Sequence, residues 1–361
     1  MVNHARHVVL VHTDGEAAAE QALAQDGWHI TRVSGVTDAM DCAKRDQPSA
    51  VVFRGALADG VSLAKKLRCN ARTALLPLVI VADAAADERE ELARWGVTSV
   101  LPAGSGGDLI ASTVRELAPL PPPTQAPDGE LGRADRLEAL ERAKLLDSPP
   151  EEPFDRLARF AGQLLDVPIV LMSVVDRQRQ FFKAQVGLPE PLCETRETPI
   201  THSFCQWVVT GDEALVVEDA RRDLLLSVSP ATLKMGVVAY AGVPIRVLPD
   251  ETVGSFCAVD MKPHKWDPRE LKALSDVATV VQGLTALRQV EWLPPVTLDE
   301  FRGLAGTTGR AIDAALRLHE AGATRVDAAE QQALLAIASG LGRDLSRASE
   351  RSASRASSSA R

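Results

Sequence analysis

The sequence contains few aromatic residues and no long apolar segment. Phe, Trp and Tyr make up 4% of its 361 residues, and Tyr240 is the one tyrosine. No apolar run approaches the ~20 residues that a membrane-spanning helix needs. The N-terminal stretch MVNHARHVVLV holds too few apolar residues in a row for the hydrophobic part of a signal peptide. We therefore predict a cytoplasmic protein with no membrane segment.

The sequence also lacks an excess of basic residues and a regular cysteine spacing. With 40 Lys and Arg against 49 Asp and Glu, the net charge is −9, which argues against a nucleic-acid-binding body. Five cysteines are odd in number and widely scattered, so we expect free thiols in a reducing compartment. They are Cys42, Cys69, Cys193, Cys205 and Cys257.

Three compositional breaks divide the chain. Residues 118–132, APLPPPTQAPDGELG, are expected to form a proline-rich linker. Paired prolines in EWLPPVT, residues 291–297, predict the end of a helix. Residues 346–361 are rich in Arg and Ser and contain no large apolar residue, so we predict a disordered tail.

Residues 1–117 alternate between two kinds of segment. Short apolar runs occupy 7–11, 50–54 and 76–82, with a weaker run at 98–102. Helix-like stretches such as 16–27 and 59–70 separate them. Apolar strands that alternate with helices predict an α/β fold with a doubly wound parallel sheet.

Residues 133–291 show a different pattern. Two helical stretches, 133–147 and 152–166, precede a set of strand-like runs at 168–176, 179–187, 214–220, 237–247 and 254–260. A long helix over 267–291 closes the region. We predict an α+β domain with a mainly antiparallel sheet. Residues 297–345 are predicted to form a pair of helices that docks on the preceding helices or on a partner.

The first region resembles the receiver domain of bacterial response regulators. The resemblance lies in VVLV at 8–11, in the Asp59–Gly60 pair after the third strand, in Pro77 and in Gly96. The resemblance implies a phosphoacceptor aspartate, an acidic pair that binds Mg²⁺, a hydroxyl residue and a lysine at the ends of the strands. Carboxylates hold the hard cation, and the lysine neutralises the acyl phosphate.

None of these groups stands at its expected position. The positions hold Arg54, His12 with Thr13, Ala82 and Leu101. An arginine cannot accept a phosphoryl group as an acyl phosphate, and its charge repels Mg²⁺. We therefore predict a phosphorylation-incompetent pseudo-receiver that serves docking or dimerisation. The alternative is an unrelated doubly wound domain with a small-molecule site.

The second region resembles the GAF domain, a sensor of small molecules and chromophores in bacterial signalling proteins. The resemblance rests on segments such as TPITHSFCQWVV, VVEDARRD, VVAYAGVPI and GSFCAVD. It implies an antiparallel sheet with a cavity on one face and flanking helices that pair two copies of the chain. The expected partners are a second copy and a signalling protein: a kinase, a phosphatase or a regulator.

The stretch THSFCQWVV, residues 201–209, leaves several interpretations of Cys205 open. A catalytic thiol needs a base in reach and a third group that orients the base, and the sequence marks no such set. Bilin attachment is disfavoured, because the resemblance places the attachment cysteine shortly before VVAYAGVPI, where no cysteine occurs. The spacing of Cys193, His202, Cys205 and Cys257 matches no standard zinc motif. Two interpretations of Cys205 remain: it forms a redox pair with Cys257, or it is part of an apolar cavity wall.

The candidate ligand-binding residues follow from the expected cavity. They are Phe182, Lys183, Phe204, Cys205, Trp207, Asp219 and Tyr240. Trp207 and Tyr240 each combine an apolar body with one polar atom, which suits a planar or amphipathic ligand. No kinase, cyclase, phosphodiesterase or phosphatase motif follows the second region. We therefore predict a non-catalytic signalling protein, with a constitutive adaptor as the alternative; the ligand or cofactor is unknown.

Overall fold

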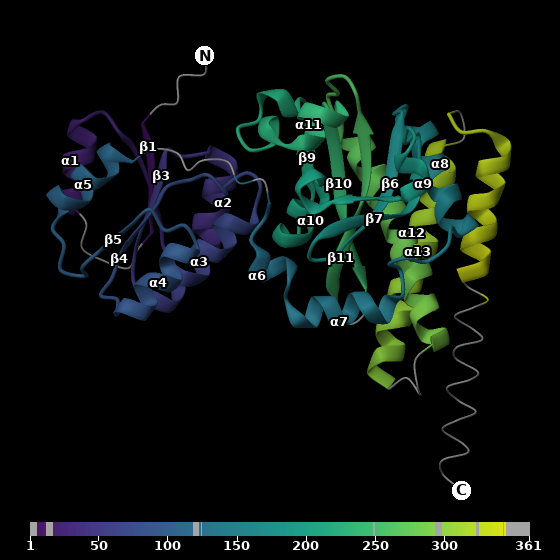
Figure 1. The fold of residues 1–361 in the computed structure, drawn as a ribbon, viewed down its shortest axis with the longest axis horizontal. Coiled ribbons are helices and arrows are strands. Elements are labelled where there is room, and N and C mark those ends of the chain that lie inside the picture. The colour runs from purple at the N-terminus through teal and green to yellow at the C-terminus, as the bar shows by residue number, and fades with distance from the viewer. Residues whose placement is uncertain are drawn as a thin grey trace, which may run out of the picture. The chain divides into compact units, whose positions relative to one another are not determined.

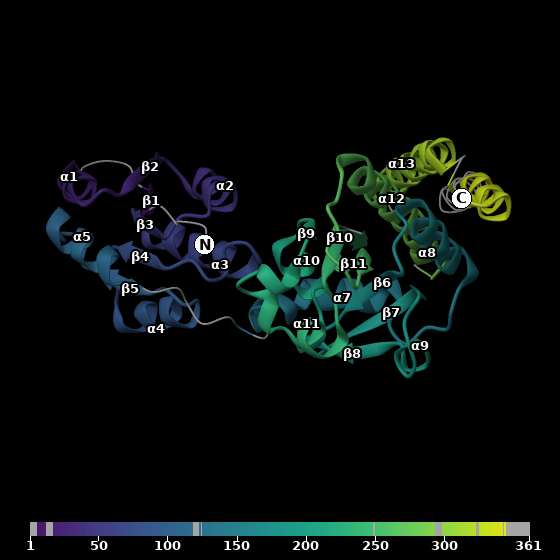
Figure 2. The ribbon, with the colours of Figure 1, turned by 90° about the horizontal axis from the view of Figure 1, so that it is seen from above.

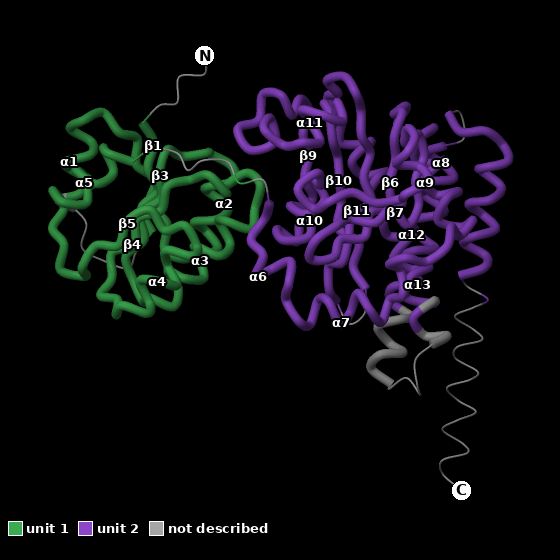
Figure 3. The backbone as a smooth tube through the Cα atoms, in the orientation of Figure 1, with its two compact units in different colours: residues 1–123 green, residues 124–361 purple. Residues whose placement is uncertain are grey.

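The computed structural model describes residues 6–11, 17–117, 123, 125–247, 250–292, 298–322, 325–341 and 343. The chain divides into two compact units, residues 1–123 and residues 124–361 (Figure 3). No helix among the described residues is long and apolar enough to cross a bilayer. The predicted acidic-pair position, residues 12 and 13, and the predicted tail lie outside the described residues.

The first unit is a doubly wound α/β fold. Its strands are β1 (His7–Val11), β2 (His29–Val33), β3 (Ala50–Arg54), β4 (Leu78–Val81) and β5 (Ser99–Leu101). All pairs are parallel, in the order β2-β1-β3-β4-β5, which is the order of the flavodoxin-like and receiver folds. Strand β2 was not predicted, because its polar, partly exposed residues at the sheet edge form no apolar run.

Helices cover both faces of this parallel sheet (Figure 1). They are α1 (Ala17–Gln25), α2 (Val36–Asp46), α3 (Leu57–Cys69), α4 (Ala86–Arg94) and α5 (Gly107–Glu116). One apolar core lies between α1, α5 and the sheet, and a second one lies between α2, α3, α4 and the other face. The inner strands β1, β3 and β4 are therefore almost wholly apolar, as burial on two sides requires.

The second unit is built on an antiparallel sheet of six strands in the order β8-β7-β6-β11-β10-β9. The strands are β6 (Ile169–Val175), β7 (Arg179–Val186), β8 (Glu197–Pro199), β9 (Leu215–Val217), β10 (Ala239–Val247) and β11 (Glu251–Asp260). Five of them correspond to predicted runs. The three-residue β8, which contains a proline, was not predicted. The predicted fold class is confirmed for both units.

One face of this sheet is covered by long helices (Figures 1 and 2). These are α7 (Ala134–Ala143), α8 (Glu152–Leu165) and α12 (Pro268–Trp292). Together with the sheet they enclose a single core that contains Phe160, Phe256 and Val281. The short α6 (Asp128–Leu131) precedes α7.

The C-terminal helices extend this covered side. Helix α13 (Leu298–Gly322) packs along α12, and a further helix over 328–341 joins the same core. A Cβ at Gly283 would collide with Ala311 Cβ, so glycine at this position permits the close approach of α13 to α12. Asp276 of α12 pairs with Arg317 of α13 at 2.7 Å.

Short elements lie over the other face or at its edges. They are α9 (Leu192–Thr195), α10 (Cys205–Gly211), α11 (Pro230–Met235) and the 3-10 turns η1 (Ile200–His202), η2 (Ala220–Arg222) and η3 (Leu226–Val228). Helix α10 contacts β6, β10 and β11. These short elements leave a hollow over the sheet.

Candidate functional site

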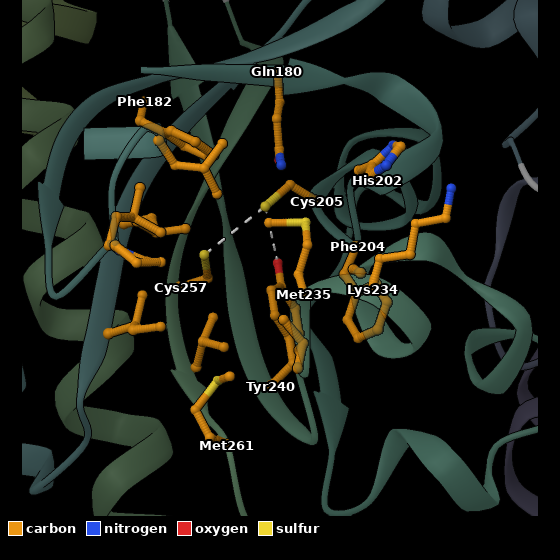
Figure 4. A pocket seen from close by; sticks show the side chains of 18 of the residues that line it. Gln180, Phe182, His202, Phe204, Cys205, Lys234, Met235, Tyr240, Cys257 and Met261 are labelled. Carbon is orange, nitrogen blue, oxygen red and sulfur yellow. Dashed lines mark hydrogen bonds between the residues drawn. The ribbon is translucent and has the colours of Figure 1, made fainter. Parts of the chain in front are cut away.

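A cavity of about 280 Å³ lies between the antiparallel sheet and the short elements (Figure 4). Its walls come from β6, β7, β10, β11, α10, α11 and the segment that leads into α9. Most of the lining is apolar, and it includes the aromatic rings of Phe182, Phe204 and Tyr240. An apolar cavity with a few polar groups is the usual form of a small-molecule site.

Strand alternation separates the cavity from the helical core. On the two central strands the cavity side carries Ile169, Leu171, Cys257 and Val259. Their sequence neighbours Val170, Met172, Phe256 and Ala258 belong to the core under the helices. Successive side chains of a strand point to opposite faces, so each central strand contributes to the cavity and to the core.

Sulfur and hydroxyl groups gather at one wall of the cavity (Figure 4). Cys205 Sγ, at the start of α10, lies 3.8 Å from Cys257 Sγ in β11. The Tyr240 hydroxyl donates to Cys205 Sγ at 3.3 Å and lies 3.2 Å from Ser255 Oγ. All four side chains are buried. The two cysteines are free thiols.

These contacts separate the acidities of the two thiols. Hydrogen bonding from the Cys257 thiol, with a further bond from the Tyr240 hydroxyl, lowers the pKa of Cys205 to about 7, although burial opposes the shift. The same pairing with Cys205, together with burial, raises the pKa of Cys257 well above its ordinary value. Burial also raises the pKa of Tyr240. Cys205 is therefore the thiol that ionises first.

Polar groups line another part of the cavity. Burial and the nearby charge of Lys234 lower the pKa of His202, which favours its neutral form. Its Nδ1 lies 3.2 Å from Thr201 Oγ1, and no described residue bonds its Nε2. Gln180 is bonded on both sides of its amide, because it accepts from Ser203 at 2.6 Å and donates to Thr198 at 2.8 Å. His202 and Lys234 can therefore bond a ligand, whereas Gln180 is held in place.

The cavity brings together most of the residues proposed from the sequence. Phe182, Phe204, Cys205, Tyr240 and Cys257 all line it. Phe204 and Tyr240 meet edge to face, with 5.5 Å between ring centroids. Lys183, Trp207 and Asp219 do not line it.

Lys183 lies on the helix-covered side of the sheet. A β-bulge between Met172 and Ser173 leaves Lys183 as the extra residue of β7, and the neighbouring Ala184 belongs to the helical core. The Lys183 ammonium is fully buried, pairs with Glu151 at 2.5 Å and lies over the Phe154 ring. It therefore holds the segment before α8 and stays away from the cavity.

Trp207 and Asp219 have other structural positions. Trp207 is buried, but it follows Cys205 by two residues, which is about 200° around a helix. Asp219 begins the η2 turn, where it accepts from the Arg221 amide at 3.2 Å and pairs with the Arg221 guanidinium at 2.7 Å. Each of these residues supports an element at the edge of the cavity.

Several cavity residues were absent from the sequence-derived set. They are Gln180, His202, Lys234, Met235 and Met261. Gln180 could have been included, because it precedes Phe182 by two residues and shares its face of β7. Lys234, Met235 and Met261 come from α11 and from the residue after β11, where no periodic pattern indicates a direction.

The strand ends of the first unit hold a different set of contacts. Arg54 ends β3 and donates to the Ser105 carbonyl at 2.8 Å. Asp83, after β4, accepts from the Ala103 amide at 3.0 Å. Among the described residues, no group of three or more His, Cys, Asp or Glu is placed to hold a metal ion. The described part of this edge therefore ties loops together through an arginine and an aspartate.

Comparison with known proteins gives one family and several relatives. The GAF domain family model matches residues 149–282. A cyclic di-GMP phosphodiesterase of Pseudomonas aeruginosa is 30% identical over 189 residues, which is 52% of this chain and 30% of that protein. The chain thus spans about a third of the length of this curated relative.

Comparison with solved structures gives matches that each cover part of this chain. The match to the receiver domain of a response regulator from Bermanella marisrubri covers 31% of this chain and 98% of the matched chain, at 18% identity and a TM-score of 0.29. The match to the cyanobacteriochrome receptor PixJ covers 40% of this chain and 95% of the matched chain, at 16% identity and a TM-score of 0.30. The second unit of this protein contains a GAF domain, and it follows a unit with the strand order of a receiver.

Proposed function

We propose that this chain is a non-catalytic cytoplasmic signalling protein whose GAF cavity binds a small molecule. The observation that carries the proposal is the apolar cavity of about 280 Å³ beside His202 and Lys234. Its volume is at the low end for ligand sites, which favours a compact ligand. The expected ligand has an apolar body and one polar or anionic group for the imidazole and the ammonium.

The proposal includes a route for the signal. Strands β6 and β11 contribute side chains to the cavity and to the core under α8 and α12. A ligand that prefers one position of these strands shifts the equilibrium of the helices that pack on them. We propose that the helices contact a second copy of the chain or a partner protein. A constitutive adaptor with a structural GAF domain is the second candidate.

Native mass spectrometry of protein purified from its host separates these two candidates. We expect a bound small molecule in the wild-type protein and its loss in Ala231→Leu, because Ala231 is buried in α11 and lines the cavity. Leu233→Ala is the matched control, since Leu233 lies on the same helix, is exposed and does not line the cavity. An empty wild-type protein, with no thermal shift across a metabolite library, supports the adaptor.

We propose further that the first unit acts without phosphoryl transfer. The guanidinium of Arg54 stands at the end of β3, where it bonds a loop carbonyl. After incubation with acetyl phosphate and Mg²⁺, intact mass spectrometry is expected to find no added phosphate on this unit. Phosphorylation of an aspartate there would overturn this part of the proposal.

The name of the curated relative suggests a direct test of the non-catalytic part. Incubation of the pure chain with cyclic di-GMP, followed by chromatography of the nucleotides, is expected to leave the substrate intact. Hydrolysis that increases with protein concentration would make the chain an enzyme.

A further inference from the structure

We propose that Cys205 and Cys257 are a redox pair that a hydroperoxide converts into an intramolecular disulfide inside the cavity. This inference goes beyond ligand binding and does not depend on it. The two sulfur atoms belong to different elements, α10 and β11, and lie 3.8 Å apart. A disulfide bond measures about 2.05 Å, so roughly 1.8 Å of approach is needed.

The surroundings of the pair permit this approach. Both cysteines line the cavity, so a small oxidant that enters it meets the sulfur atoms although the side chains are buried in the fold. Cys205 is the first residue of the seven-residue α10, which follows the short turn η1. Such a short helix can shift more easily than a strand paired on both sides, as β11 is with β6 and β10.

The two thiols have different roles in the proposed reaction. The Tyr240 hydroxyl donates to Cys205 Sγ, and the Cys257 thiol lies 3.8 Å away, where it can donate to a thiolate on Cys205. The pKa of Cys205 is lowered to about 7, whereas that of Cys257 is raised. A thiolate is the nucleophile toward peroxides, so Cys205 is the attacking sulfur and Cys257 the resolving one.

The chemistry balances with a hydroperoxide as the oxidant. The Cys205 thiolate attacks the terminal oxygen of ROOH, the O–O bond breaks, and the alkoxide leaves and takes up a proton to give ROH. Cys205 is then a sulfenic acid. Cys257 attacks this sulfur, the S–S bond forms, and the hydroxyl leaves as water with the thiol proton. Two thiols lose two electrons and the peroxide gains them; an added dithiol reverses the change by exchange.

The remaining cysteines provide internal controls. Cys42 lies in the first unit and bonds Asp46 at 3.3 Å, and burial raises the pKa of its thiol to about 11. Cys69 is buried at the end of α3, and Cys193 is partly exposed in α9. Cys205 and Cys257 bring their sulfur atoms to 3.8 Å from each other.

The test uses the full chain and peroxide without any cavity ligand. After hydrogen peroxide treatment, we expect two of the five thiols to be lost, the mass to fall by two hydrogens, and peptide mapping to join the Cys205 and Cys257 peptides. Dithiothreitol is expected to restore both thiols. Retention of all free thiols, or a crosslink that involves another cysteine, would overturn the proposal.

Two conservative variants test the order of the steps. In Cys257→Ser the reaction is expected to stop at a sulfenic acid on Cys205, which a dimedone probe labels. In Cys205→Ser we expect no dimedone label on Cys257, and Cys193→Ser is expected to form the disulfide at the wild-type rate. Labelling of Cys257 in place of Cys205 contradicts the assigned roles. If a variant fails to fold, the wild-type peptide map still decides whether the disulfide forms.

A second arm identifies the source of the oxidant. Cumene hydroperoxide is apolar and suits the cavity lining, whereas hydrogen peroxide diffuses freely. A faster reaction with the former supports an apolar hydroperoxide as the physiological oxidant, and a faster reaction with the latter supports peroxide itself. The assay is independent of native mass spectrometry, so an empty cavity with a forming disulfide leaves this inference intact while it removes the ligand-sensor proposal.

Discussion

The two sheets of this protein differ in how completely they are covered. Helices of the first unit pack on both faces of its parallel sheet, and its inner strands β1, β3 and β4 are buried on each side. The antiparallel sheet of the second unit has long helices on one face and short elements over a cavity on the other. In the first unit, both faces of the sheet are covered, so a site can form only at the strand ends. In the second unit, a site can form over one face of the sheet.

Core truncation should give the largest effect and test whether the two units are separate. Phe256→Ala removes a fully buried ring from the second unit, and Leu63→Ala removes a buried side chain from the first. We expect losses of about 3–5 and 2–5 kcal/mol in the free energy of unfolding. Denaturation followed by circular dichroism should shift only the transition of the mutated unit. A shift of both transitions by either variant would contradict this separation.

Replacement of Lys183 should distinguish a structural ammonium from a ligand-binding one. Lys183→Met breaks the buried contacts with Glu151 and Ser148, so we expect a loss of roughly 2 kcal/mol in the stability of the second unit. Lys234→Met is the matched control, because Lys234 is exposed and lines the cavity. It should change stability by less than about 0.5 kcal/mol and weaken ligand binding. Weaker ligand binding in Lys183→Met, with stability unchanged, would show that Lys183 binds the ligand.

Arg54 tests the strand ends of the first unit. Arg54→Ala removes the bond to the Ser105 carbonyl, and we expect a loss of about 1 kcal/mol from the first unit alone. Arg72→Ala serves as the control, since Arg72 is exposed. Equal stability of the two variants in urea titrations would show that Arg54 does not hold this loop.

The last prediction concerns how acid changes the stability of the packing between α12 and α13. Burial disfavours the charge of Asp276, but hydrogen bonds from Arg317 and Lys272 outweigh it and lower its pKa. The stabilisation is therefore complete above the ordinary carboxyl pKa and is lost as the pH falls through the lowered value. Asp276→Asn should lower the free energy of unfolding by about 1 kcal/mol at neutral pH. In acid, the variant and the wild type should become equally stable. Glu320→Gln removes an exposed carboxylate of α13 and serves as the control variant.

Periodicity predicts much of this fold, and the departures have physical causes. Apolar runs placed four of five parallel strands and five of six antiparallel strands, because buried strands need such residues. The strands β2 and β8 lie at sheet edges, where polar side chains are tolerated. Lys183 directly follows the cavity-lining Phe182, so strand alternation alone places it on the opposite face of the sheet. The bulge adds one residue to β7 and brings Ala184 to the helical side as well, and no local pattern marks such an insertion.

The residues of the cavity also fall into a predicted and an unpredicted group. The resemblance to GAF domains indicated Phe182, Phe204, Cys205, Tyr240 and Cys257, which all come from elements with recognisable motifs. Lys234, Met235 and Met261 come from a short helix and from the end of a strand, and tertiary packing alone decides where they point. The 3.8 Å between the two sulfur atoms is likewise a tertiary fact, since 52 positions separate the cysteines in sequence.

Strand β11 has one more consequence. Cys257 faces the cavity, and its neighbours Phe256 and Ala258 face the helices, so a single backbone layer separates the chamber from α12. Any sideways step of Cys257 moves its two neighbours, because three consecutive Cα atoms share rigid peptide planes. On the proposed sensor function, β11 itself can carry a displacement from the cavity to the core under α12, and no relay of side chains is needed.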